Sequence, residues 1–178
     1  MRPLLPDHTI LGLIAAQPKH GYDLLALFQA QEELGRVWTL SQSQLYNVLK
    51  RLERKGFIHG EKRQSSMAPT RTEYRITPTG YKKLEEWLFD RQPPASIRGI
   101  RVEFLSKLHI CSLLGLDPRT IIEKQRATCV CQRDRILTQR HNTESVTESL
   151  TLEFVISQLN AAIDWLDNIY ATYAVHSE

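Results

Sequence analysis

The sequence predicts a mainly α-helical protein that contains one small β-hairpin and is divided into two domains. Three helix-like apolar stripes precede two strand-like stretches in the first half of the chain. A Gln-Pro-Pro sequence at 92–94 marks a linker, and no strand pattern follows it. The C-terminal part instead carries an apolar heptad repeat, which is typical of helices that pack along their length. We therefore expect domains at 1–91 and 97–178, joined by a linker at 92–96.

The composition is that of an ordinary globular protein. The chain has 178 residues, enough for one or two domains, with 42% hydrophobic and 24% charged residues. No apolar run approaches the roughly 18 residues of a membrane span, and the N-terminal residues make a poor secretory signal. Three cysteines, an odd number, argue against a disulfide framework and fit a reducing compartment. We expect a cytoplasmic protein.

The first domain opens with three amphipathic helices. The first is expected over 7–16, with Asp7 as its cap, and the second from about 20 to 33. Ser41 and Gln44 have the spacing of a capping box, which predicts that the third helix begins at Ser41. The core stripe of the third helix has helical spacing and consists of Leu45, Val48, Leu49 and Leu52.

Two strands and a fourth helix follow. Residues 57–64 and 71–77 read as strands on either side of a polar loop, and Pro78 fits the first turn of a helix, where its missing amide costs nothing. Three helices, a hairpin and a helix in this order form a winged helix-turn-helix. This fold places the exposed face of its third helix in the major groove of DNA.

The side chains expected to contact DNA lie on the third helix and on the hairpin. Polar and basic groups on the helix suit base edges and phosphates, and arginines beside the hairpin tip suit backbone phosphate. The predicted DNA-binding residues are Gln42, Ser43, Gln44, Tyr46, Asn47, Lys50, Arg51, Arg63 and Arg71.

The charge distribution supports this surface. The net charge is only +3, but the segment 50–75 holds eight basic against three acidic residues, so the excess sits in one stretch. The alternative is a solvated helix face without a partner, and charge alone favours that alternative. The polar and basic residues expected on the exposed face of the third helix favour an anionic partner over that alternative.

The second domain is expected to consist of three helices, over about 97–114, 118–140 and 145–173. The last helix repeats apolar residues every four and three positions for about three heptads. We expect this seam to pair with a second chain as a twofold dimer. The alternative is an antiparallel hairpin with the helix at 118–140, and the two contacts are compatible with each other. The seam residues are Leu152, Ile156, Leu159, Ile163, Leu166, Tyr170 and Tyr173.

Enzymatic and metal-binding readings lack the residues they need. There is no glycine-rich phosphate loop, nucleophile elbow or His-Glu-x-x-His sequence, so we expect no enzyme and no cofactor. Cys129 and Cys131 lie two apart, which points their side chains about 200° apart on a straight helix. They are therefore not expected to hold one metal ion together.

Four segments resemble the PadR-type transcriptional regulators, in the longer subgroup with a separate C-terminal domain. They are 20–24 (HGYDL), 45–58 (LYNVLKRLERKGFI), 73–80 (EYRITPTG) and 101–108 (RVEFLSKL). Asn47 stands where the family commonly has proline, which adds a side chain able to read a base. The resemblance implies a dimeric, mostly repressing regulator, with DNA bound by the third helix and the wing. It also implies a small aromatic or hydrophobic effector in many members.

The sequence therefore predicts a sequence-specific regulator, a repressor, that binds a palindromic operator as a homodimer. Its partners would be double-stranded DNA, a second copy of the chain and a small effector, with no membrane. The alternative is a winged-helix protein-protein interaction module or anti-regulator that does not bind DNA.

Overall fold

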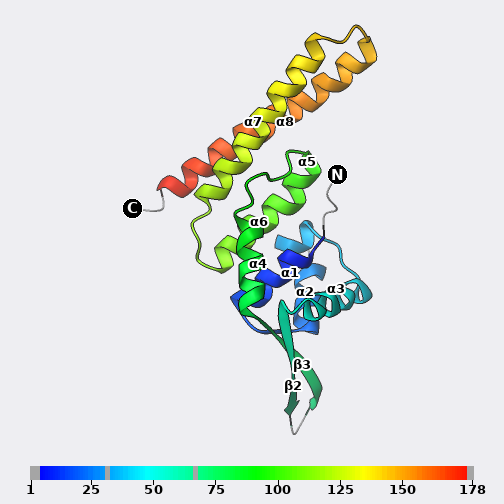
Figure 1. The fold of residues 1–178 in the computed structure, drawn as a ribbon, viewed down its shortest axis with the longest axis vertical. Helices are drawn as coiled ribbons and strands as arrows, with labels where there is room; N and C mark the ends of the chain where they lie inside the picture. Colours follow the sequence, from blue (N-terminus) through cyan, green and yellow to red (C-terminus); the bar gives the residue numbers. More distant parts are fainter. Residues whose placement is uncertain (1–4, 31–32, 66–67, 176–178) are drawn as a thin grey trace. The chain divides into compact units, whose positions relative to one another are not determined.

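The computed structural model describes residues 5–30, 33–65 and 68–175 and confirms a mainly helical chain with one small antiparallel sheet. The chain forms two compact units (Figure 1). The first contains the residues up to Phe89 together with Leu105–Leu116. The second contains Asp90–Phe104 and the residues from Asp117 onward.

The first unit is built on three helices that share one apolar core. They are α1 (Asp7–Ala16), α2 (Gly21–Gln29) and α3 (Gln42–Arg54), with a short 3-10 turn at Glu33–Arg36 between the last two. Each helix turns its apolar stripe inward, so that the side chains of lowest exposure come from all three. This core includes Ile10, Leu11, Leu13, Ile14, Leu24, Phe28, Leu45 and Leu49.

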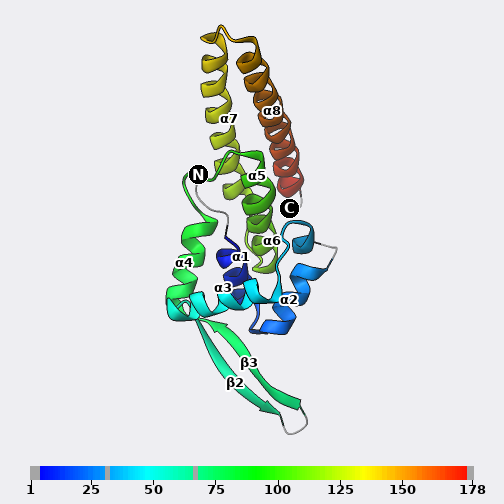
Figure 2. The ribbon, with the colours of Figure 1, turned by 90° about the vertical axis from the view of Figure 1, so that its right-hand side faces the viewer.

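The hairpin is longer than expected and gains a third strand. Strands β2 (Ile58–Ser65) and β3 (Ala68–Ile76) pair antiparallel and project from the helices (Figures 1 and 2). The short strand β1 (Lys19–His20) pairs with β3 on its other side, giving the order β1-β3-β2. Two residues carry too little pattern to reveal a strand, and only pairing with β3 defines it. The winged helix-turn-helix prediction is confirmed with this addition.

The next helix, α4 (Pro78–Leu88), is fixed to the base of the wing. The Thr77 side chain caps it by accepting the Gly80 amide at 3.0 Å, and the Thr77 hydroxyl donates to the Gly56 carbonyl at 2.6 Å. The Thr77 amide donates to the Phe57 carbonyl at 3.0 Å. A Cβ atom at Gly80 would lie 2.0 Å from that same carbonyl oxygen, so only glycine fits this approach.

Helix α6 (Leu105–Leu113) packs in the first unit, although the sequence placed residues 97–178 together in a second domain. It contacts α1 closely, because a Cβ at Gly12 would lie only 2.6 Å from the Ile110 side chain. The Trp38 indole donates to the Ser106 hydroxyl at 2.8 Å. The compact units therefore divide differently from the expected domains, whose boundaries stay a prediction.

The second unit is dominated by two long helices that lie side by side (Figure 2). They are α7 (Arg119–His141) and α8 (Val146–Val175), preceded by the short α5 (Ile97–Gly99) and a π-helical turn at Ile100–Phe104. Arg126 pairs with Asp167 and Arg140 with Glu153, and both ion pairs join the two long helices. Among the described helices, none is both long and apolar enough to cross a membrane.

The heptad seam of α8 is already covered within one chain. Ile156, Leu159, Ile163 and Leu166 are 7% exposed or less, because the seam packs against α7. These four residues therefore leave water without a second chain, and pairing of the seam residues with a second chain stays a prediction. The antiparallel hairpin, the alternative, is what forms. Towards the two ends of the seam Leu152 is half-buried, the half-buried Tyr170 donates to Glu123 at 2.8 Å, and Tyr173 is exposed.

Candidate DNA-binding surface

Helix α3 separates its residues cleanly into a buried and an exposed face. Its four core leucine and valine side chains are 4% exposed or less. The predicted capping box is confirmed, because Ser41 accepts the Gln44 amide at 3.3 Å and the Gln44 side chain accepts the Ser41 amide at 2.9 Å. The cap fixes where the helix starts and so which side chains turn outward. The exposed ones are the six predicted DNA-binding residues Gln42, Ser43, Gln44, Tyr46, Asn47 and Lys50, together with Glu53 and Arg54 in the last turn.

These exposed residues differ in how far they are engaged within the chain. Gln44 is held by the capping box, and Ser43 shares a 3.1 Å hydrogen bond with the Ser41 hydroxyl. Asn47 and Lys50 are exposed one helical turn apart, with no acidic side chain in the first turn of α3. The structure thus presents an amide and an ammonium together on one accessible surface.

Arg51 has an internal partner. Its guanidinium donates to both carboxylate oxygens of Asp7, at 2.7 and 2.6 Å. The hydrogen bond to Asp7 raises the pKa of Arg51, so the guanidinium stays charged. Asp7 was expected to cap α1, but the residue before the helix is Pro6 and the Asp7 side chain turns to Arg51 instead. The pair ties the start of α1 to the last turn of α3, so contact between Arg51 and DNA stays a prediction.

Removing Arg51 should therefore affect folding more than DNA binding. The Arg51→Ala variant leaves the Asp7 carboxylate, whose side chain is 9% exposed, without its partner. We expect a loss of about 2 kcal/mol in the free energy of unfolding, below the range for fully buried pairs because Arg51 is 30% exposed. The Asp7→Asn/Arg51→Ala double variant should lose less than the sum of the single losses in urea titrations. Additive losses would contradict a coupled pair.

The wing contributes its arginines differently. The backbone register pairs Arg63 with Arg71 across β2 and β3, next to an irregularity between Arg63 and Ser65. Arg71 is exposed, and for Arg63 the structure describes the strand but not the side chain. The two arginines predicted to contact DNA from the wing thus lie directly opposite each other on β2 and β3. Arg71 also lines the cleft described next.

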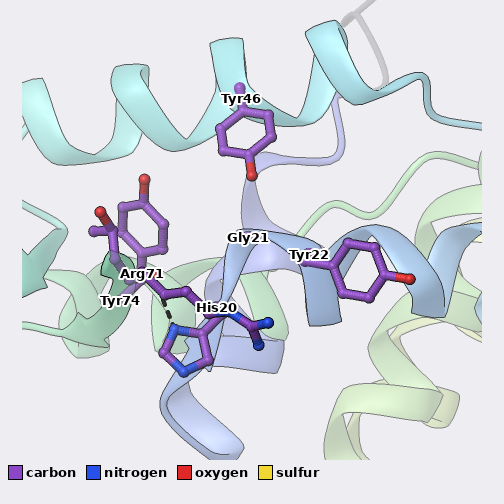
Figure 3. A pocket seen from close by; sticks show the side chains of 7 residues that line it. His20, Gly21, Tyr22, Tyr46, Arg71 and Tyr74 are labelled. Atoms are coloured by element: carbon purple, nitrogen blue, oxygen red, sulfur yellow. Dashed lines mark hydrogen bonds between the residues drawn. The ribbon is translucent and has the colours of Figure 1, made fainter. Parts of the chain in front are cut away.

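A cleft of about 400 Å³ lies between α2, α3 and β3 (Figure 3). Tyr46 hangs from α3 above Gly21, with Tyr74 and Arg71 to one side and Tyr22 to the other. Only two of the lining residues, Tyr46 and Arg71, were predicted to contact DNA. The lining consists of His20, Gly21, Tyr22, Tyr46, Arg71, Thr72 and Tyr74.

Close packing fixes the shape of this cleft. A Cβ at Gly21 would lie 2.9 Å from the Tyr46 hydroxyl oxygen, so the tyrosine ring rests directly on the start of α2. The His20 ring is held by a 3.2 Å hydrogen bond between Nδ1 and the Thr72 carbonyl. Burial raises the pKa of Tyr74, and the Glu53 carboxylate adds to this shift, so its phenol stays a hydrogen-bond donor. The pairing of β1 with β3 brings these residues together, and no pattern in the sequence predicts that pairing.

Comparison with known proteins identifies the first unit. Residues 10–86 match the family described as transcriptional regulator PadR-like. A curated relative, the negative transcriptional regulator PadR of Bacillus subtilis (strain 168), is 34% identical over 115 residues. The match covers 61% of this chain and spans 57% of the length of that protein.

Solved structures of similar proteins carry related descriptions. Bacillus subtilis PadR in complex with operator DNA is 25% identical, with a TM-score of 0.46, covering 94% of this chain and 98% of that one. The same regulator in complex with p-coumaric acid gives 24% identity and a TM-score of 0.43, with 95% and 98% covered. A PadR-like regulator from Bacillus cereus is 30% identical, with a TM-score of 0.39, covering 45% and 74%.

Proposed function

We propose that this chain is a repressor that binds a palindromic operator as a homodimer, because its residues 10–86 match the PadR-like transcriptional regulators. The observation that carries the proposal is the exposed polar face of α3, where Asn47 and Lys50 stand clear of the core. An asparagine amide can bond an adenine edge in two places, and a lysine matches backbone phosphate. In this proposal Asn47 reads sequence and Lys50 anchors the helix.

The remaining predicted contacts fill supporting roles in the same proposal. Gln42 and Tyr46 share a helical row with Lys50, at intervals of four residues, so a duplex lying along α3 would meet all three. Ser43 and Gln44 fix the helix start and reach DNA at the first turn. Arg63 and Arg71 contact the backbone from the wing. Repression follows the curated relative, which is described as a negative regulator.

The dimer is proposed on a different surface from the heptad seam. Val146, Leu150 and Phe154 are 74%, 62% and 64% exposed and follow one another at intervals of four residues on α8. Such a stripe of large apolar side chains in water favours association. A twofold pairing of identical chains covers it on both copies and presents two DNA-binding units to a palindrome. The seam residues then stabilise the hairpin that carries the stripe.

A small aromatic or hydrophobic effector that releases the DNA is the further part of the proposal implied by the family resemblance. It would act by binding the free and the DNA-bound chain with different affinity. The competing function, a protein-protein module without DNA binding, would leave the exposed face of α3 without a role.

A binding measurement with two variants tests the function. A duplex site is first selected from a random-sequence pool and then titrated by fluorescence anisotropy at two salt concentrations. Lys50→Ala should weaken selected and random duplexes alike and reduce the salt slope by about one. Asn47→Ala should cost about 1–3 kcal/mol on the selected duplex and little on random DNA.

The outcomes separate the proposals. Lys82, exposed on α4, supplies the charge-matched control, and Lys82→Ala should bind as the wild type does. Equal losses for Asn47→Ala on both duplexes would remove its reading role. A wild-type chain that binds no duplex at low salt would favour the protein-protein module.

A further inference from the structure

The cleft beneath Tyr46 has the chemistry of an anion site. Its described lining includes Arg71, His20 and three tyrosines, and the Tyr46 hydroxyl points towards Gly21 (Figure 3). No carboxylate is among the described lining residues, and Glu53 acts on Tyr74 from outside the lining. Guanidinium and phenol groups donate hydrogen bonds to phosphate oxygens, and bonds to a charged acceptor are the strong ones. The aromatic walls add apolar surface beside these donors.

The cleft also lies where a duplex would pass. Tyr46 stands on α3 four residues before Lys50 and four after Gln42, so the ring that roofs the cleft belongs to the DNA-facing row. Arg71 and Tyr74 come from β3, the central strand of the sheet. The cleft is therefore bordered by the recognition helix on one side and the wing on the other (Figure 3).

We propose that this cleft seats one phosphodiester of the bound DNA strand together with its deoxyribose. This rests on the proposed function and adds His20, Tyr22 and Tyr74 to the residues that meet DNA. A volume of about 400 Å³ exceeds what a phosphate alone fills and suits a phosphate with its sugar. Arg71 and the Tyr46 hydroxyl bind the phosphate oxygens, while the tyrosine rings pack against the sugar.

The proposed phosphate site depends on contacts that hold the walls of the cleft in place. Gly21 lets the Tyr46 ring rest on α2, and the His20–Thr72 hydrogen bond holds α2 to β3. The two walls of the cleft are thus fixed before DNA arrives, and little ordering is needed on binding. A site of this kind positions the recognition helix without reading a base.

A double-mutant cycle that combines variants of the cleft residues with neutralised DNA phosphates tests this proposed phosphate site. Single methylphosphonates are placed along the selected duplex, each removing one backbone charge. Arg71→Met and Tyr46→Phe are then titrated beside the wild-type chain. On unmodified DNA we expect Arg71→Met to raise Kd about tenfold and Tyr46→Phe about threefold, on selected and random duplexes alike. At one methylphosphonate in each half-site these losses should vanish.

Matched controls and the contrary outcomes complete the test. Tyr81→Phe and Lys82→Met, both exposed on α4, should bind every duplex as the wild type does. Wild-type affinity in both cleft variants would overturn the seat and point to a free small molecule as the ligand. Losses that add at every methylphosphonate position would also overturn it. A wild-type chain that binds no duplex would refute the proposed function itself, and the seat with it.

Discussion

Replacing Leu166 with alanine should lower the free energy of unfolding by about 3 kcal/mol while leaving the dissociation constant of the dimer unchanged. Leu166 is fully buried within a single chain, where the seam of α8 packs against α7. Truncating it removes buried apolar surface and leaves a cavity inside the hairpin. Urea unfolding followed by circular dichroism measures the first quantity, and sedimentation equilibrium measures the second.

Replacing Phe154 with aspartate should weaken the dimer and leave the free energy of unfolding nearly unchanged. Phe154 is 64% exposed, so a charge there costs little in the folded monomer but disrupts an apolar contact between copies. We expect a monomeric protein with near wild-type unfolding, and about 100-fold weaker operator binding because the two half-sites are no longer linked. Asp164→Asn, a charge change at another exposed site on α8, serves as the control. A Leu166→Ala protein that dissociates without loss of stability would restore the seam as the dimer contact.

Replacing Gly80 with alanine should lower the free energy of unfolding by about 2–3 kcal/mol, although alanine is the better helix former by about 1 kcal/mol. The added methyl group would lie 2.0 Å from the Phe57 carbonyl oxygen, a backbone atom that no side-chain rotation can move aside. Relief requires α4 to shift away from the base of the wing, which strains the Thr77 cap and its bond to Gly56. Thermal unfolding measures the loss.

The neighbouring residue supplies the control for this substitution. Thr79 is exposed in the same turn of α4, and Thr79→Ala should change stability by no more than about 0.5 kcal/mol. A Gly80→Ala protein as stable as the wild type would contradict the close approach of α4 to the Phe57 carbonyl.

Local signals in the sequence predicted most of the architecture. The capping box at Ser41 and Gln44 set the start of α3, and the periodicity of its leucines set the buried face. Because an α-helix repeats every 3.6 residues, the buried stripe also determines which side chains are exposed. The periodicity therefore predicted that Asn47 and Lys50 lie on the surface, and both are exposed.

Contacts between distant residues were beyond such reasoning. Arg51 looked like one more cation on a basic helix, yet Asp7, 44 residues earlier, accepts hydrogen bonds from two of its guanidinium nitrogens. The cleft escaped prediction for the same reason, since β1 exists only through its pairing with β3. A two-residue strand has no periodicity of its own to detect.

The α8 seam shows most clearly what each level decides. The spacing of Ile156, Leu159, Ile163 and Leu166 determined that this face is buried, because apolar residues at heptad positions must leave water. It could not determine which helix buries them, because a heptad seam is satisfied equally by its own chain or by another. In the tertiary structure the short turn between α7 and α8 folds the two helices back on each other. Because the connection is short, pairing α8 with α7 costs little loop-closure entropy. The sequence by itself thus determined the winged-helix elements and the faces they bury, and only the fold decided which helix covers each apolar face and which surfaces stay exposed.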